Sequence, residues 1–129
     1  MKILTIASLA LGLMATTSFA EGHASGDAAE GKKVFKKCKS CHMIADDAGE
    51  VIAKGGKSGP NLYGLLGRTA GAQADFGKKY GKDLVAAGAA GVIWDEASFV
   101  AWMADPRGFL RTTLDNSKAK SKMSFRIKD

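Results

Sequence analysis

Residues 38–42 read Cys38-Lys39-Ser40-Cys41-His42, the most informative pattern in the sequence. The pattern C-x-x-C-H is the attachment signature of c-type haem. Cysteines at positions i and i+3 of a helical turn lie on one side of the backbone, so their thiols can reach the two vinyl groups along one porphyrin edge. His42 then projects under the ring toward the iron. We therefore expect one covalent haem c, attached through Cys38 and Cys41, with His42 as an iron ligand.

Paired cysteines also occur in thioredoxin-like redox sites, in structural disulfides and in zinc sites. A redox pair needs a strand–motif–helix context within a sheet, and this sequence has no strand-rich pattern. Zinc needs further ligands and would have to recruit His23 from near the start of the chain. The histidine directly after Cys41 favours haem over all three alternatives.

Length and composition predict a single globular domain that follows a secretory signal. The chain has 129 residues, 46% of them hydrophobic, and a formal net charge of +6, which argues against a disordered tail, a collagen-like repeat or a disulfide-dense mini-protein. Its long apolar stretch, residues 3–15, follows Lys2 and precedes the small residues around Ala20. A membrane span needs roughly 20 apolar residues, so an uncleaved anchor is the less favoured interpretation. We expect a signal peptide at 1–20, a haem domain at 21–129 and a periplasmic location.

The segment before the haem motif has the pattern of a helix. Asp27, with Glu30 three residues later, predicts a helix start, and the helix is expected to run through about residue 39. An apolar stripe at i, i+3, i+4 and i+7 predicts one buried face, made of Gly31, Val34, Phe35 and Cys38.

The rest of the chain is expected to be loop-rich. Residues 49–91 hold 11 of the 16 glycines, which predicts loops with short helical turns at 61–66 and 82–87. Residues 95–105 regain a helical pattern, which Pro106 should end. No convincing strand is seen. The predicted fold class is therefore all-α, a few helices and loops wrapped around a haem that supplies much of the core.

Methionines offer the candidates for the second iron ligand. Met43 adjoins His42 and cannot reach across the ring, and Met103 lies in an apolar helical pattern where methionine commonly fills a core. Met123 instead lies in a polar segment, Ser121-Lys122-Met123-Ser124, where burying a thioether needs a reason. We expect Met123 to be the sixth ligand. A His/Met pair raises the reduction potential and leaves little room for substrate or oxygen, which favours an electron carrier over a haem enzyme or gas sensor with an open iron.

The sequence resembles the class I cytochromes c, most closely the small soluble carriers of purple photosynthetic and denitrifying bacteria. The matching stretches cover most of the chain after the expected signal and comprise residues 31–42, 58–68, 94–106 and 118–125. The resemblance implies the cytochrome c fold and one-electron transport without enzymatic activity.

The resemblance also implies roles for residues around the haem. The carbonyl of Pro60 would accept the second N–H of His42, which would fix its tautomer. Arg68, Tyr80 and Trp94 would hold the buried propionates, which need donors or a positive partner. Ser121 matches a hydroxyl residue near the haem.

Two positions depart from the family pattern. Trp102 stands where the family usually has a tyrosine whose hydroxyl lies near the methionine sulfur, and an indole N–H could donate there. The family also continues past the segment matching Phe125 into a C-terminal helix that crosses the first helix near Gly31. Here the sequence stops at Asp129, and the unpartnered stripe around Gly31 favours an incomplete sequence over a lost helix.

The resemblance finally implies partners. The expected partners are membrane redox complexes, such as a bc-type quinol oxidoreductase and a photosynthetic reaction centre or a terminal oxidase or reductase. A monomer with no nucleic acid and no small-molecule substrate is expected. Lysines that flank the haem-enclosing segments predict a basic docking patch that steers short-lived complexes, made of Lys36, Lys37, Lys39, Lys57, Lys118, Lys120 and Lys122.

Overall fold

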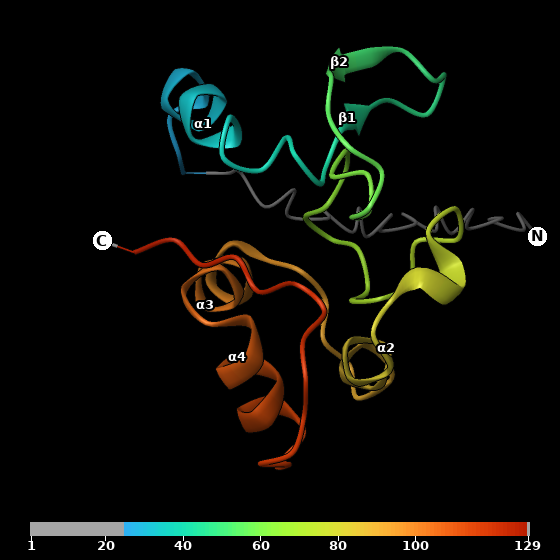
Figure 1. The fold of residues 1–129 in the computed structure, drawn as a ribbon, viewed down its shortest axis with the longest axis vertical. Helices are drawn as coiled ribbons and strands as arrows, with labels where there is room; N and C mark the ends of the chain where they lie inside the picture. Colours follow the sequence, from blue (N-terminus) through green and yellow to red (C-terminus); the bar gives the residue numbers. More distant parts are fainter. Residues whose placement is uncertain (1–24, 129) are drawn as a thin grey trace, which may run out of the picture.

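Helices dominate residues 25–128, the part of the chain that the computed structural model describes (Figure 1). The elements are α1 (Ala28–Phe35), β1 (Ile44–Ala45), β2 (Val51–Ala53), the 3-10 turn η1 (Gly77–Lys79), α2 (Lys82–Ala89), α3 (Glu96–Ala104) and α4 (Pro106–Thr113). This helical, loop-rich architecture confirms the predicted fold class. The expected signal peptide at 1–20 and His23 lie outside the described residues. Within 25–128, no helix is long and apolar enough to cross a membrane.

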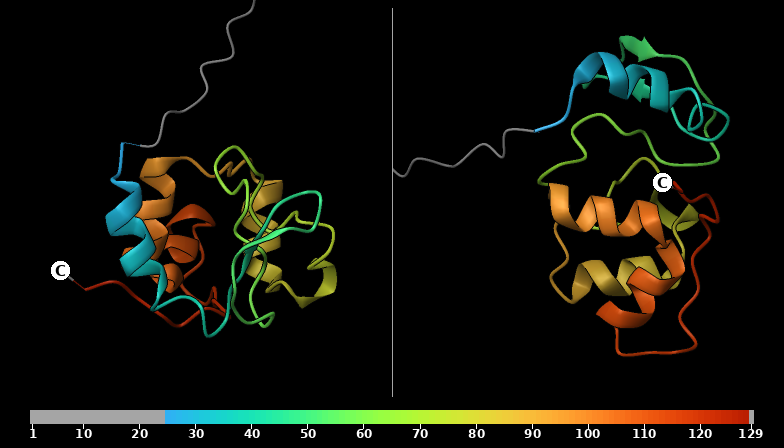
Figure 2. Two further views of the ribbon diagram at one scale, coloured as in Figure 1. Left: turned by 90° about the horizontal axis from the view of Figure 1, so that it is seen from above. Right: turned by 90° about the vertical axis from the view of Figure 1, so that its left-hand side faces the viewer.

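The elements form two groups, one on each side of a long central loop. Figures 1 and 2 show α1 and the β1–β2 hairpin on one side, with α2, α3 and α4 on the other. The C-terminal segment, drawn in red, runs back past α4 and α3 toward the first group. The haem motif at 38–42 belongs to the first group, and Met123 belongs to the segment that returns from the second.

Helix α1 is shorter and more exposed than its sequence pattern predicts. Asp27 caps it as expected, because its side chain accepts a hydrogen bond from the Glu30 N–H. The helix ends at Phe35 rather than near residue 39, because the backbone then switches to i→i−3 bonds, such as Cys38 N–H to Phe35 O at 2.8 Å. The predicted burial of the stripe is not found: α1 has no buried residue and Val34 is 41% exposed. Among the described elements, none packs against α1.

A short antiparallel hairpin follows the haem motif, where the sequence pattern predicts no strand. Ile44 pairs with Ala53 and Ala45 with Val51. The turn is made by Asp46, whose carboxylate accepts the N–H groups of Ala48 and Glu50 at 3.0 and 2.8 Å. Strands of two and three residues are too short to show an alternating pattern, which explains the wrong prediction.

Helices α3 and α4 meet at a sharp corner. Asp95 and Ser98 form a capping box at the start of α3, and the helix ends at Ala104, as the pattern predicts. Pro106 then begins α4 rather than a loop, because proline at the first helical position needs no N–H partner. The sequence analysis missed α4 because it took Pro106 only as a stop.

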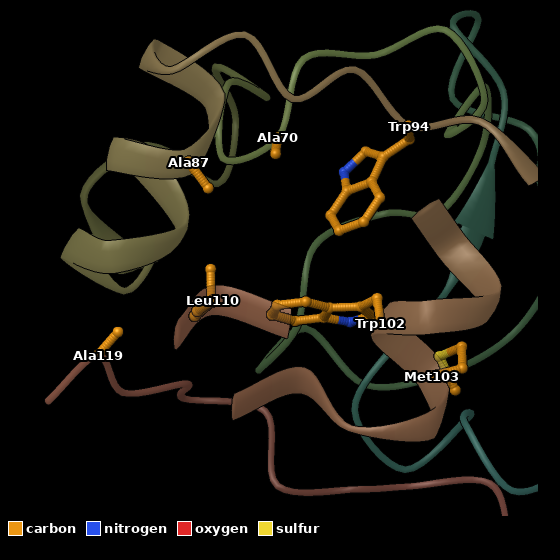
Figure 3. Packing of buried hydrophobic residues seen from close by; sticks show 7 residues of the cluster. All are labelled: Ala70, Ala87, Trp94, Trp102, Met103, Leu110 and Ala119. Carbon is orange, nitrogen blue, oxygen red and sulfur yellow. The ribbon is translucent and has the colours of Figure 1, made fainter. Parts of the chain in front are cut away.

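The buried core lies on the α2–α4 side (Figure 3). Trp94 and Trp102 meet edge to face with ring centroids 5.5 Å apart, and Phe109 stacks on Trp94 at 5.8 Å. The predicted turn at 82–87 is confirmed as part of α2, whereas residues 61–66 form turns and no helix. The other members of this cluster are Ala70, Ala87, Met103, Leu110 and Ala119.

Candidate functional site

A cavity of about 370 Å³ lies between the two groups of elements, and nearly all the predicted site residues line it. The surface of its walls is mostly apolar, with contributions from Leu62, Leu65, Leu84 and Phe99. An apolar cavity with a few convergent polar groups is the usual form of a cofactor site. The predicted residues among its walls are Cys38, Cys41, His42, Pro60, Tyr80, Trp94, Ser121 and Met123.

The ring of His42 is held in one orientation by a backbone carbonyl. Its Nδ1 lies 2.8 Å from the oxygen of Pro60, as the resemblance implies. Since a carbonyl only accepts, Nδ1 carries the proton and donates it, which leaves Nε2 with its lone pair free. That is the tautomer a metal ligand requires.

Glycines allow the chain to approach His42 closely. A Cβ added at Gly59 would lie 2.3 Å from His42 Cε1, and one at Gly55 would lie 1.7 Å from the His42 carbonyl oxygen. Both distances are impossible for a real side chain, so these positions require glycine. Backbone bonds fasten the loop to the motif: Gly59 N–H donates to Cys41 O, and Gly56 N–H to Lys39 O, each at 2.8 Å.

The two motif cysteines are free thiols in different surroundings. Cys38 is half-buried and Cys41 is exposed. Burial raises the pKa of the Cys38 thiol, with a smaller rise from nearby Cys41. Hydrogen bonds from the hydroxyls of Ser58 and Ser40 lower the pKa of Cys41. Both thiols line the cavity, where each can reach a group placed within it.

Met123 is held in the cavity wall by a bond to its sulfur. The Trp102 Nε1–H donates to Met123 Sδ at 3.3 Å. Ser121 shapes the local turn, because its hydroxyl donates to the Met123 carbonyl at 2.8 Å and accepts from the Met123 N–H at 3.1 Å. At position 102, where the family usually has a tyrosine, the contact with the methionine sulfur is therefore made by an indole N–H. Met103 also lines the cavity and is 8% exposed, whereas Met43 does not line it.

Of the three residues implied to hold the propionates, two line the cavity and the third lies next to one of them. Tyr80 and Trp94 line the cavity, and Arg68 does not. The Arg68 guanidinium donates to the backbone carbonyl of Asn61 at 2.9 Å and to that of Tyr63. Burial raises the pKa of the Tyr80 phenol, and the neighbouring Arg68 charge opposes that rise. Arg68 thus lies beside the wall residue Tyr80.

Four lysines line the cavity, namely Lys37, Lys79, Lys120 and Lys122. Three of them belong to the predicted patch, whose remaining members Lys36, Lys39, Lys57 and Lys118 are exposed but do not line it. Sequence reasoning missed Lys79, which lies in the loop-rich region. The Lys122 ammonium donates to the Lys79 carbonyl at 2.8 Å, which brings these two segments together.

Asn61 is a second residue that the sequence analysis missed. Its side chain donates to the Ala45 carbonyl at 2.7 Å and accepts from the Ala45 and Tyr63 N–H groups. It ties the loop that carries Pro60 to strand β1. An asparagine directly after a loop proline is a signal for such side-chain-to-backbone bonding.

These residues fit a covalent haem, which the two thiols would attach and the imidazole and thioether would ligate. The thiols of Cys38 and Cys41, the imidazole of His42 and the thioether of Met123 converge on one apolar cavity from both groups of elements. Among residues 25–128, no group of three or more His, Cys, Asp or Glu side chains could hold a bare metal ion. The donor set is that of a haem iron rather than of an all-protein metal cage.

Comparisons with known proteins identify close relatives. The chain is 58% identical over 121 residues to cytochrome c-551 of Roseobacter denitrificans, an overlap of 94% of this chain and 85% of that protein. The crystal structure of cytochrome c2 from Rhodobacter sphaeroides superimposes with a TM-score of 0.77 at 50% identity, over 81% of this chain and 85% of that one. That of cytochrome c2 from Paracoccus denitrificans gives 0.74 at 42%, over 79% and 84%. A scan against models of protein families finds no match.

Proposed function

The chain belongs to the class I cytochromes c of the c2, c-550 and c-551 type, and from this premise we propose that His42 and Met123 ligate its haem iron while it carries single electrons between membrane-bound redox complexes. Members of this family carry one covalent haem c and transfer electrons rather than catalyse a reaction. When bound, the haem iron supplies the one-electron change between its ferric and ferrous states. The remaining roles fall to the residues of this chain.

One observation carries the ligand proposal: the imidazole of His42 and the thioether of Met123 line the same cavity. The proton of His42 Nδ1 is committed to Pro60, so Nε2 is the free donor atom. Trp102 occupies one lone pair of the Met123 sulfur and leaves the other for the iron. Cys38 and Cys41 supply the two thioether bonds.

The proposed propionate site consists of Tyr80 and Trp94 in the cavity wall and Arg68 behind them. A carboxylate buried in an apolar wall needs hydrogen-bond donors, and the phenol and the indole each offer one. Arg68 adds a positive charge next to Tyr80. Ser121 acts in this proposal by shaping the turn that presents Met123.

The proposed docking surface is the rim of the cavity around Lys37, Lys79, Lys120 and Lys122. These exposed cations would meet an acidic patch on the electron donor and on the acceptor, for which a bc-type quinol oxidoreductase and a reaction centre or terminal oxidase are the candidate classes. Complexes formed in this way associate fast and dissociate readily, and they weaken as salt rises. The proposed carrier acts as a monomer in the periplasm, exported by the signal at 1–20.

The proposal is tested by visible spectra of the holoprotein matured in a bacterial periplasm. Ligation by Met123 predicts a low-spin ferric spectrum with the weak red band of an iron–thioether bond, and no carbon monoxide binding to the ferrous protein at neutral pH. A high-spin spectrum, or rapid binding of carbon monoxide, would identify an open iron of the kind found in haem enzymes and gas sensors.

A further inference from the structure

Met123 lies in the middle of a span that is tied to the rest of the protein at its two ends. We call residues 120–127 the Met123 strap. The Lys120 N–H bonds to Asp83, and the Ile127 N–H bonds to the Met103 carbonyl at 2.9 Å. Between them, no backbone group of residues 121–126 bonds to another segment of the described chain. The position of the strap backbone that carries Met123 therefore depends on how firmly the two ends are held.

The first end is fastened to a well-packed helix. Asp83 lies in the first turn of α2, is half-buried, and accepts the Lys120 N–H through Oδ2 at 2.8 Å. Helix α2 is itself anchored, since Ala87 is fully buried and Gly88 sits directly against the Ala70 carbonyl. A carboxylate that accepts a backbone N–H forms a charge-assisted bond, roughly twice as strong as a neutral one. The bond joins positions 37 residues apart in the sequence.

The second end has a backbone bond and an exposed ion pair. Besides the Ile127 bond, the Arg126 guanidinium lies 2.9 Å from the Asp105 carboxylate, and both side chains are 46% exposed. An ion pair with this exposure is screened by salt and holds weakly. Side-chain bonds also hold residues between the ends, since the Lys122 ammonium donates to the Lys79 carbonyl and the Trp102 indole N–H donates to the Met123 sulfur. Among the described residues outside the strap, Asp83 is the one whose side chain bonds to the strap backbone.

We propose that Asp83 is a positioning residue, whose carboxylate fastens the Met123 strap and keeps the Met123 sulfur at the cavity. This inference rests on the proposed ligation of iron by Met123. The methionine side chain has several rotatable bonds and adapts easily, so the backbone must supply the precision. Without the bond to Asp83, the first end of the strap would lose its backbone fastening and keep the side-chain bonds of Lys122 to Lys79 and of Trp102 to Met123. The strap would then leave the cavity, and the iron would open, more often.

The test measures how often the strap opens in the ferric holoprotein. Imidazole can bind only after the sulfur leaves, so its limiting binding rate, followed by the loss of the red iron–thioether band, reports the opening. Asp83→Ala should raise that rate about ten-fold or more, the factor expected for a lost bond to a charged group. Asp83→Asn keeps an acceptor without its charge and should give an intermediate rate.

Asp75→Ala is the matched control. Asp75 is an exposed carboxylate that makes no hydrogen bond or ion pair within the described part of the chain, so its removal should leave the rate unchanged. Guanidinium unfolding, followed by circular dichroism, should shift far less in Asp83→Ala than the opening rate does. This difference separates positioning from a general structural role.

Three results would overturn the inference. The first is a rate in Asp83→Ala equal to that of the unaltered protein, which would leave the proposed function intact. The second is an increase in the imidazole binding rate of Asp83→Ala that is matched by an equal loss of global stability, or an Asp83→Asn rate no different from that of Asp83→Ala. The third is an unaltered protein without the red band, which would remove the Met123 ligation together with this inference. If Asp83→Ala fails to fold, the imidazole binding rate of Asp83→Asn, compared with that of Asp75→Ala, decides whether the inference holds.

Discussion

The His42 side and the Met123 side of the cavity are built in opposite ways. His42 lies directly after Cys41, its ring is oriented by Pro60, and the neighbouring loop approaches so closely that Gly59 cannot carry a side chain. Met123 lies in a strap whose backbone is bonded to other segments three and four residues away, at Lys120 and Ile127. The proposed ligand His42 is held by the loop that follows it in the sequence, and the proposed ligand Met123 by contacts between distant segments.

The difference has a functional meaning. A rigid His42 side keeps the proposed haem attached and oriented, whatever happens on the other face. Because few bonds hold the Met123 strap, the contacts of the Met123 sulfur, notably the one with Trp102, are expected to set how strongly this proposed ligand binds iron. Changes on the first side should therefore damage stability and haem retention, whereas changes on the second should alter potential and ligand access.

The largest effect should come from crowding the rigid side. In Gly59→Ala the new Cβ would lie 2.3 Å from the His42 ring, which is held in its orientation by its bond to Pro60. Overpacking of this kind costs about 1–3 kcal/mol of unfolding free energy. Guanidinium unfolding and the yield of holoprotein measure it. Gly26→Ala is the control, because a Cβ there meets nothing within 4 Å. Equal stability of the two variants would show that the His42 side is not rigid.

Removing Met123, the proposed second ligand, should open the iron and leave the fold intact. In Met123→Ala we expect ferrous carbon monoxide binding, loss of the red band, and a reduction potential lower by on the order of a hundred millivolts, since axial ligands set potentials over about 0.8 V. Voltammetry and spectra measure both. Met103→Leu is the matched control, because Met103 also lines the cavity. If that variant loses the band and Met123→Ala keeps it, Met103 is the ligand.

A smaller change is expected from the indole contact. Trp102→Phe removes the N–H that donates to the Met123 sulfur while keeping an aromatic ring. That hydrogen bond withdraws electron density from the sulfur and so disfavours ferric iron. Its loss should lower the potential by some tens of millivolts, from about 1 kcal/mol per bond and 59 mV per tenfold change for one electron. Phe109→Leu disturbs the same aromatic cluster without touching the sulfur and should leave the potential unchanged. A drop in both variants would point to packing.

The same contrast explains what the sequence could predict. The haem motif is a contiguous pattern, so the roles proposed for Cys38, Cys41 and His42 follow from spacing alone. The cap at Asp27 and the helix over 95–105 also come from local signals. Local signals do not report what a surface packs against, which is why the exposed α1 stripe was predicted to be buried. The hairpin at 44–53 is made by the turn around Asp46, with strands too short to be seen.

Contacts between distant segments could not be derived from the sequence. The sequence does not show how α2 and α4 pack, and the contacts Asp83–Lys120 and Asp105–Arg126 depend on that packing. Helix α4 itself was missed because Pro106 both ends one helix and begins another. The Trp102 contact was recognised only as an option raised by the family resemblance. The Met123 side is therefore the part of the site for which the structure adds most.

The smallest effect should come from the exposed ion pair at the end of the strap. Arg126→Gln should raise the imidazole binding rate by less than about five-fold at low salt, and the difference should vanish near 1 M salt, because exposed pairs are weak and screened.

Asp105 adds a pH dependence. Its pKa lies below the usual value, first because the Gly108 N–H binds the carboxylate and, to a lesser degree, because Arg126 lies nearby. A lowered folded-state pKa stabilises the protein above the unfolded pKa, and this contribution is lost as the pH falls through the folded value. Acidification should therefore bring the rate of the unaltered protein up to that of Arg126→Gln, whose own rate changes less. A rate difference that persists at low pH and high salt would mean that Arg126 acts through packing, and that the second end of the strap is as firmly built as the first.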